Sequence, residues 1–192
     1  MAVAARATLE RSSFTPGDDV FVLGAGPMGT FSALIAESSG GNAVIGGLSN
    51  DEPRFETISA IGIETVNLEV TSLEAVSEEA TGGTFDILID ATGSTAALEE
   101  NIEVLRRGGD AVVIGIPTGR LGIPTPSFVR GERRVSGSYG ATIADFERAI
   151  DILGTVESEM SELLRRYDVE AVDDAFRNFL EGDVIKPIID VN

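Results

Sequence analysis

The sequence predicts an α/β fold, in which a doubly wound parallel sheet is followed by a helix-strand tail. Short apolar runs, typical of parallel strands buried on both faces, alternate with segments of helical pattern. A glycine-rich turn joins the first of these runs to a helix. Beyond the last predicted strand of the sheet, the pattern changes to amphipathic helices and one final strand. We therefore expect a lead-in helix and turn at residues 1–18, the sheet domain at 19–141 and the tail at 142–192.

The glycine-rich turn follows a predicted strand at residues 20–23 and opens a predicted helix at 28–39. In this context Gly24 permits a tight turn, Gly26 lets a pyrophosphate approach the backbone, and Gly29 lets the helix lie close to the sheet. The free N–H groups and positive dipole end of that helix would face the phosphates. The spacing therefore predicts a dinucleotide site; a glycine turn that binds nothing is the alternative. The residues predicted to bind the pyrophosphate are Gly24, Gly26, Pro27, Met28 and Gly29.

The other elements are predicted from apolar runs, helical composition and the Gly and Pro residues that end them. A helix is expected before the first strand, at residues 2–9. Further strands of the sheet are expected at 43–45, 64–67, 85–90, 111–115 and 134–138. Helices between them are expected at 51–60, 72–80 and 96–105, and a loop rich in Pro and Gly at 117–126. In the tail we expect helices at 143–153 and 172–180 and a strand at 185–191.

The charge balance is strongly acidic, with 14 Lys and Arg against 32 Asp and Glu and a formal net charge of −18. Lys186 is the one lysine, and the carboxylates are dispersed along the chain. This pattern is typical of a halophilic cytoplasmic protein whose carboxylates hold water and cations at high salt, although acidity kept for solubility is the alternative. Nucleic acid and anionic membranes need a basic face, so we expect neither as a partner.

The residues that are missing limit the chemistry of the chain. The sequence contains no Cys and no His, so it offers neither a disulfide framework nor a thiolate metal site. It has no run of about 18 apolar residues, which excludes a conventional membrane-spanning helix. Its first residues lack the apolar core of a signal peptide, which favours a cytoplasmic location.

Several segments, taken in order, resemble the medium-chain dehydrogenase/reductase superfamily, and within it the zinc-type alcohol, polyol and threonine dehydrogenases. The resemblance covers nearly the whole chain and is carried by residues 15–20, 24–29, 54–63, 85–93, 105–109, 113–117 and 176–188. It implies a Rossmann domain that binds NAD or NADP, and a parent protein that transfers hydride between an alcohol and this cofactor. It also implies a homodimer, in which an edge strand at 133–138 pairs across a two-fold axis.

The resembled family holds its catalytic zinc with Cys, His and Glu in a separate N-terminal domain. This sequence supplies no zinc ligands, so we expect neither a catalytic residue nor a metal site in it. Asp90 and Asp145 could be proposed as bases, but a carboxylate at a strand end or helix start is more often structural. We therefore expect the chain to bind a nicotinamide dinucleotide without turning over an alcohol.

Cofactor choice in the resembled family depends on the end of the second strand, where NAD-binding members carry an acid about 20 residues beyond the glycines. Here the stretch Gly46-Gly47-Leu48-Ser49-Asn50 fills that place and contains no acid, which removes the main repulsion against a 2′-phosphate and gives a slight lean towards NADP. Arg54 could contact that phosphate, or could instead pair on its own helix with Asp51 or Glu52. The residues predicted at this end of the cofactor are Gly47, Ser49, Asn50 and Arg54.

By the same resemblance, five residues would border the ribose and nicotinamide, although ordinary strand-end turns are the alternative. They are Thr92, Gly93, Ile116, Gly137 and Ser138.

Two other functions are open. A non-enzymatic NAD(H)-sensing regulatory domain is also a single Rossmann unit, but has no reason to carry the tail at 176–191. A methyltransferase is the weaker option, because its cofactor lacks a pyrophosphate.

Overall fold

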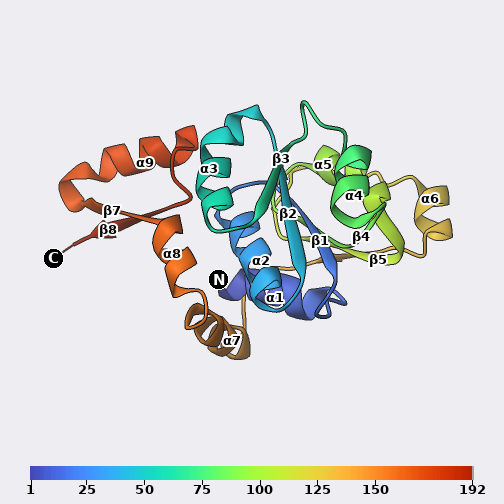
Figure 1. Ribbon diagram of the computed structural model, residues 1–192, viewed down its shortest axis with the longest axis horizontal. Helices are drawn as coiled ribbons and strands as arrows, with labels where there is room; N and C mark the ends of the chain where they lie inside the picture. Colours follow the sequence, from blue (N-terminus) through green and yellow to red (C-terminus); the bar gives the residue numbers. More distant parts are fainter. Residues whose placement is uncertain (192) are drawn as a thin grey trace.

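The computed structural model describes residues 1–191, and its centre is a six-stranded parallel sheet in the order β3-β2-β1-β4-β5-β6 (Figure 1). The chain winds outward from β1 through β2 and β3, and then returns to the other side of β1 with β4, β5 and β6. This confirms the predicted doubly wound sheet. The strands are β1 (Asp19–Leu23), β2 (Asn42–Gly47), β3 (Glu64–Asn67), β4 (Phe85–Asp90), β5 (Leu105–Val113) and β6 (Arg134–Gly137).

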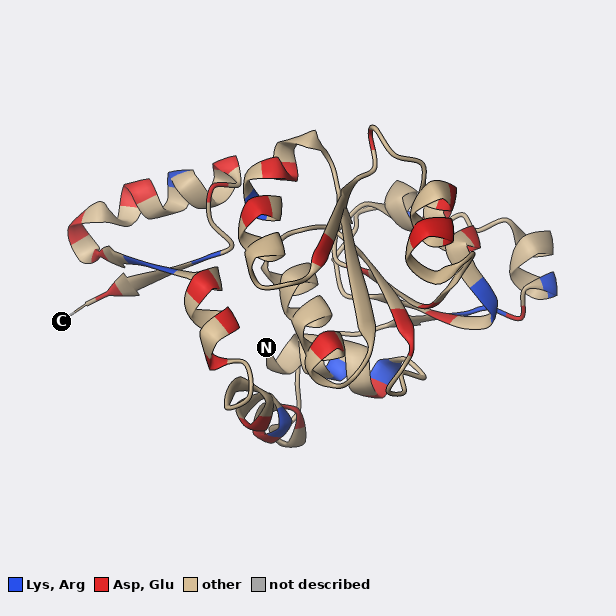
Figure 2. Cartoon of the chain, viewed as in Figure 1, with Lys and Arg blue, Asp and Glu red and all other residues tan. Residues whose placement is uncertain are grey.

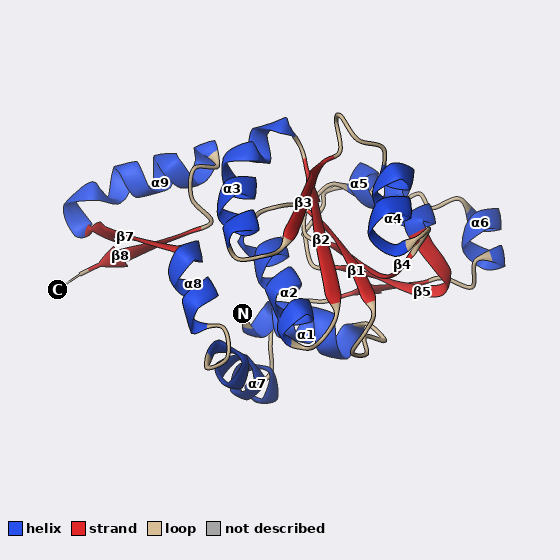
Figure 3. Ribbon diagram, viewed as in Figure 1, coloured by secondary structure: helices blue, strands red, loops and turns tan. Residues whose placement is uncertain are grey.

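Helices cover both faces of the sheet, which explains why its central strands are continuously apolar (Figure 3). On one face, Val20 and Val22 of β1 pack in a core with α1 (Ala2–Arg6), α2 (Pro27–Ser38) and α3 (Glu52–Ala60). On the other face, Phe21 and Leu23 pack in a second core with α4 (Leu73–Thr81), α5 (Thr95–Asn101) and α6 (Thr125–Arg130).

The region around β5 differs from its prediction. The helix expected at 96–105 ends at Asn101, and a 3₁₀ turn (Ile102–Val104) leads directly into β5. Gly108 and Gly109 were expected to stop that helix, but they lie inside the strand. A Cβ on Gly109 would lie 2.9 Å from the Asp86 carbonyl oxygen, so glycine is needed for close pairing with β4, where the register shifts. The Pro- and Gly-rich loop also contains α6, which the sequence pattern did not predict.

The tail consists of α7 (Ile143–Leu153), α8 (Glu157–Leu163), β7 (Leu164–Asp168), α9 (Val172–Glu181) and β8 (Lys186–Asp190). The predicted helices and final strand are confirmed, whereas α8 and β7 were missed. β7 and β8 form a separate parallel ribbon, which lies with α9 at the opposite end of the molecule from α6 (Figure 1). The ribbon lies outside the main sheet. The predicted boundaries between the sheet domain and the tail stay a prediction.

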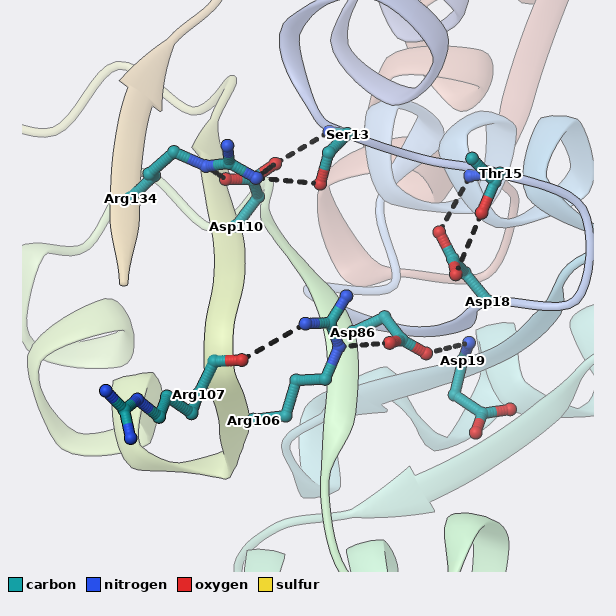
Figure 4. A network of polar contacts seen from close by, with 9 residues as sticks. All are labelled: Ser13, Thr15, Asp18, Asp19, Asp86, Arg106, Arg107, Asp110 and Arg134. Carbon is teal, nitrogen blue, oxygen red and sulfur yellow. Dashed lines mark hydrogen bonds and ion pairs between the residues drawn. The ribbon is translucent and has the colours of Figure 1, made fainter. Parts of the chain in front are cut away.

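Ion pairs tie the lead-in segment and the strands together at the amino-terminal edge of the sheet (Figure 4). Asp110 is buried in β5, where it pairs with Arg134 and accepts a hydrogen bond from the backbone N–H of Ser13 at 2.7 Å. Nearby, Arg106 pairs with Asp86 at the start of β4. These polar groups stabilise the edge opposite the carboxyl ends of the strands, which are left free for a ligand.

Acidic side chains are spread over the helices and strands rather than gathered on one element (Figure 2). Within residues 1–191, no helix is long and apolar enough to cross a membrane.

Candidate dinucleotide-binding site

A pocket of about 690 Å³ lies at the carboxyl ends of β1, β2 and β4, where the strand order reverses. Open α/β sheets bind their ligands at this switch point. The walls come from the turn after β1, the end of β2 with the start of α3, the loop after β3, and the loop after β4 with α5. The volume lies in the range of about 300–1,000 Å³ that is usual for ligand pockets.

The glycine turn has the geometry that the sequence predicts. Gly24 has a φ of +101°, which favours glycine, and its N–H donates to the carbonyl oxygen of Gly46 at 2.7 Å. A Cβ on Gly29 would lie only 1.9 Å from the carbonyl oxygen of Gly24, so a side chain there would push α2 off the sheet. The assigned roles of Gly24 in the turn and Gly29 in close packing agree with this geometry.

Gly26 is different, because nothing in the described chain requires a glycine at this position. Its φ of −73° and ψ of 177° suit any residue, and a Cβ there would meet no atom within 4 Å. The residue lines the pocket and caps α2 without a side chain. The first N–H groups of α2, at Met28 and Gly29, are therefore left for an anion to satisfy. This open cradle fits a pyrophosphate.

At the end of β2, the carboxylate of Asp51 turns back onto Gly47. A Cβ on Gly47 would lie 2.8 Å from Asp51 Oδ2, and the same oxygen accepts a hydrogen bond from the Leu48 N–H at 3.1 Å. The sequence predicted that no acid would lie at the end of β2. The structure corrects this expectation in part, since the position is glycine but a carboxylate from four residues further on fills its place.

Two of the three polar residues offered to a 2′-phosphate, Arg54 and Ser49, are engaged by neighbours. Arg54 donates from Nη1 to Asp51 Oδ1 at 2.8 Å and from Nη2 to the carbonyl oxygen of Phe179 in α9 at 3.0 Å, which confirms its pairing on its own helix. Ser49 donates its N–H to Glu69 Oε2 at 2.8 Å. Hydrogen bonding by Ser49 lowers the pKa of Glu69, which keeps this carboxylate charged. Asn50 lines the pocket and is exposed.

The loop after β4 is held by Asp90, which is buried at the strand end. Thr92 donates to Asp90 Oδ1 from its N–H at 2.9 Å and from its hydroxyl at 2.7 Å. These contacts give Asp90 a structural role. Asp145 is likewise fully buried, in the capping box that opens α7.

The residues expected beside the nicotinamide lie along the carboxyl edge of β4, β5 and β6. Of these, Thr92 lines the pocket. Gly93 has a φ of +74° and approaches Ile116, whose carbonyl oxygen would lie 3.9 Å from a Cβ on Gly93. Gly137 and Ser138 lie at the end of β6, outside the pocket, where the Ser138 N–H donates to the Val113 carbonyl at 2.9 Å.

Sequence reasoning missed several residues that line the pocket. Glu69 follows the end of a short strand, and Asp51 follows the Gly46-Gly47 pair, so both could have been found by asking which side chains reach the carboxyl edge of the sheet. The other missed residues are Leu23, Ala25, Gly46, Leu48, Leu68, Ala91, Ser94, Ala96, Ala97, Glu100 and Asn101. Among residues 1–191, no group of three metal-ligating side chains lies together, and the donor set does not fit the zinc of the resembled family.

Comparisons with known proteins agree with this site. A family model described as "Glucose dehydrogenase C-terminus" matches residues 2–191. A sorbitol dehydrogenase of Halalkalibacterium halodurans is 29% identical over 185 residues, which cover 94% of this chain and 54% of the relative. An L-threonine 3-dehydrogenase of Saccharopolyspora erythraea is 29% identical over 178 residues, with coverages of 91% and 51%.

Solved structures show the same fold. Benzyl alcohol dehydrogenase from Acinetobacter calcoaceticus matches with a TM-score of 0.88 at 21% identity, covering 100% of this chain and 54% of that one. An alcohol dehydrogenase from Thermotoga maritima matches with a TM-score of 0.84 at 27% identity, with coverages of 98% and 54%. The chain spans about half the length of the relatives that it matches. It belongs to the glucose dehydrogenase C-terminus family, as the cofactor-binding part of a zinc-type medium-chain dehydrogenase/reductase.

Proposed function

We propose that this chain binds a nicotinamide dinucleotide in the pocket at the switch point, for a parent protein that transfers hydride between an alcohol or polyol and the cofactor. The observation that carries this proposal is Gly26. Its backbone and packing tolerate any residue, yet glycine leaves the pocket open against the first turn of α2. No contact within the described chain requires glycine at this position, whereas a bound pyrophosphate would require it.

The residues present fit such a cofactor along the carboxyl edge of the sheet. The turn after β1 and the N-terminus of α2 would hold the pyrophosphate, and the end of β2 would hold the adenosine ribose. Thr92, Gly93, Ile116, Gly137 and Ser138 would border the ribose and nicotinamide at the other end. When bound, the cofactor supplies the hydride acceptor or donor. The residues of this chain orient it and shield one side of it from water.

Exposed apolar faces in the tail support the proposal that another part of the parent protein packs against them. In α7, Ile143, Phe146 and Ile150 recur at helical spacing and are each more than half exposed. In α9, Phe176 and Leu180 form a second exposed apolar face. We propose that the half of the relatives not matched by this chain covers these faces and brings the catalytic zinc. The chain alone should therefore bind cofactor without alcohol-dependent production of NAD(P)H.

The edge strand supports a homodimer. Within the described sheet, β6 pairs on one side only, with β5, as predicted for an edge. We propose that residues 133–138 pair with the same strand of a second copy.

The dispersed acidity supports a halophilic protein of the cytoplasm. The family match extends through α9 and β8, so it lends no support to a separate regulatory sensing domain.

Calorimetry with NAD and NADP tests dinucleotide binding on three proteins. The wild-type chain should bind at least one of the two, and Gly26→Val should abolish binding by filling the pyrophosphate position. Gly154→Val is the matched control: this glycine lies at the C-cap of α7 with a φ of −65°, and its Cβ would be 3.4 Å from the nearest atom. Equal affinity in wild type and Gly26→Val would refute the proposed binding site. Alcohol-dependent NAD(P)H production by this chain would instead refute the proposal that the chain alone does not turn over an alcohol.

A further inference from the structure

We propose that Asp51 takes over the role of the acid missing from Gly47, and that together with Glu69 it makes this pocket selective for NAD over NADP. The inference rests on the proposed dinucleotide binding. It replaces the slight preference for NADP that was predicted from the sequence, because that prediction assumed an uncharged end of β2.

The first argument is the position of the Asp51 carboxylate. Its Oδ2 lies 2.8 Å from where a Cβ on Gly47 would be, about the distance at which residue 47 would carry its own carboxyl group. Any side chain at 47 would collide with this oxygen and with Phe55, whose Cζ would be 2.9 Å from the Cβ. The glycine therefore makes room for a carboxylate from the 3₁₀ turn (Ser49–Asp51) that precedes α3, rather than for a phosphate.

The second argument is that this carboxylate is held in place. The Leu48 N–H donates to Oδ2 at 3.1 Å, and Arg54 Nη1 donates to Oδ1 at 2.8 Å. The side chains of Asp51 and Arg54 are each only 15% exposed, so solvent screens them little. Arg54 also donates from Nη2 to the Phe179 carbonyl oxygen, so its two terminal nitrogens hold the acid and the tail, while its buried Nε has no partner among the described residues.

The third argument is a second carboxylate on the same wall. Glu69, in the loop after β3, accepts the N–H of Ser49, the backbone group that a 2′-phosphate would otherwise use. The Ser49 hydroxyl accepts from Asn67 Nδ2 at 3.0 Å, and this amide also donates to Glu52 at 3.1 Å. Both the backbone and the side chain of Ser49 are therefore already paired.

These contacts discriminate between the two cofactors by charge and by hydrogen bonding. Ribose hydroxyls can donate to carboxylates, which accept only. A 2′-phosphate carries about −1.5 to −2 charges at neutral pH and cannot donate once ionised. Placed beside Asp51 and Glu69, it would meet like charges in a chain whose formal net charge is already −18; the ion pair with Arg54 offsets part of the Asp51 charge, whereas Glu69 has no such cation partner among the described residues.

The test is calorimetry of the full chain with NAD and with NADP, for wild type, Asp51→Asn and Glu56→Gln. Glu56 is exposed on α3, the helix that follows Asp51, and does not line the pocket, so its variant controls for the loss of one charge. The affinity of the wild-type chain for NAD should exceed its affinity for NADP by a factor of about ten or more. Asp51→Asn should narrow this ratio several-fold, while Glu56→Gln leaves it unchanged. Glu69→Gln should narrow the ratio in the same direction and carries the test if Asp51→Asn does not fold by circular dichroism.

Salt gives an independent readout of opposite sign for the two interpretations. Between about 0.1 M and about 1 M KCl the Debye length falls from ~10 Å to ~3 Å. If carboxylates repel the 2′-phosphate, the affinity for NADP relative to NAD rises with salt; if Arg54 attracts it, that ratio falls. A falling ratio, a wild-type preference for NADP, or an unchanged ratio in the carboxylate variants would overturn the inference. Binding of neither cofactor would instead refute the proposed function itself.

Discussion

The carbonyl oxygen of Gly24 occupies the space that a side chain on Gly29 would need, with only 1.9 Å between that oxygen and an added Cβ. The contact joins the turn after β1 to the first turn of α2. The position of the helix N-terminus therefore depends on close backbone packing between these two glycines. Gly26, between them, has no such packing role. The three glycines of one motif therefore serve different purposes, which substitution can separate.

Alanine at Gly29 should mainly reduce stability, whereas alanine at Gly26 should mainly reduce dinucleotide binding. Gly29→Ala forces overpacking between α2 and the turn, and we expect it to destabilise the chain by about 1–3 kcal/mol. Gly26→Ala adopts the native backbone without strain and restricts the unfolded chain, but alanine is a poorer N-cap than glycine, so the two effects should nearly cancel in stability while dinucleotide binding weakens. Urea unfolding with and without NAD measures both effects. A Gly26→Ala chain destabilised as much as Gly29→Ala, with unchanged NAD binding, would show that this glycine serves the fold rather than the ligand.

Asp145 should make folding sensitive to acid. Hydrogen bonding from the Thr142 backbone lowers the pKa of this buried carboxyl, and Arg6 and Arg148 add to the effect. Because the folded-state pKa lies below the unfolded one, the stabilisation is fully present above about pH 5 and is lost as the pH falls from ~4 through the lowered pKa. The difference in unfolding free energy between wild type and Asp145→Asn should therefore be constant near neutrality and shrink in acid. A difference that grows on acidification would contradict this assignment.

Withdrawal of salt should destabilise the fold. With 32 acidic and 14 basic residues, the folded chain confines repelling carboxylates, and the Debye length of ~30 Å at 0.01 M salt hardly screens them. The melting temperature should fall steadily as KCl is reduced from molar concentration. NaCl at the same ionic strength serves as a control for a specific effect of potassium. Melting curves that coincide at low and molar salt would argue for acidity kept only for solubility.

The free edge of β6 should lead to a dimer. Light scattering at molar KCl, where charge repulsion between copies is screened, should give twice the mass of one chain. A monomer at high protein concentration would remove this assignment. The exposed Val129 of α6, near this edge in sequence, offers apolar surface that a second copy can bury.

The sequence predicted the parts of this molecule that depend on local pattern. Gly24, Gly26 and Gly29 identified the first strand, the turn and the helix because their spacing reflects backbone geometry within a few residues. β7 was missed because Arg165, Arg166 and the other exposed positions give it no apolar run, its pairing with β8 being a tertiary effect.

The same limit explains two misreadings, one inside β5 and one at the end of β2. Gly108 and Gly109 have the composition of a helix stop, and only the close approach of β4 shows why they belong to a strand. Asp51 was passed over because its carboxylate reaches Gly47 across a turn, a placement fixed by Leu48 and Arg54. Charge at a binding site therefore has to be judged in space rather than at one aligned position.

The most direct test of the account is an NMR titration of the isotopically labelled chain with NAD. If the pocket at the switch point binds the dinucleotide, the largest amide shifts should fall on Gly26, Met28 and Gly29 and at the end of β2, with Gly154 unchanged. The Gly26→Val chain should show none of these shifts at the same NAD concentration. Shifts confined to other parts of the chain, or the same shifts in Gly26→Val, would contradict the account.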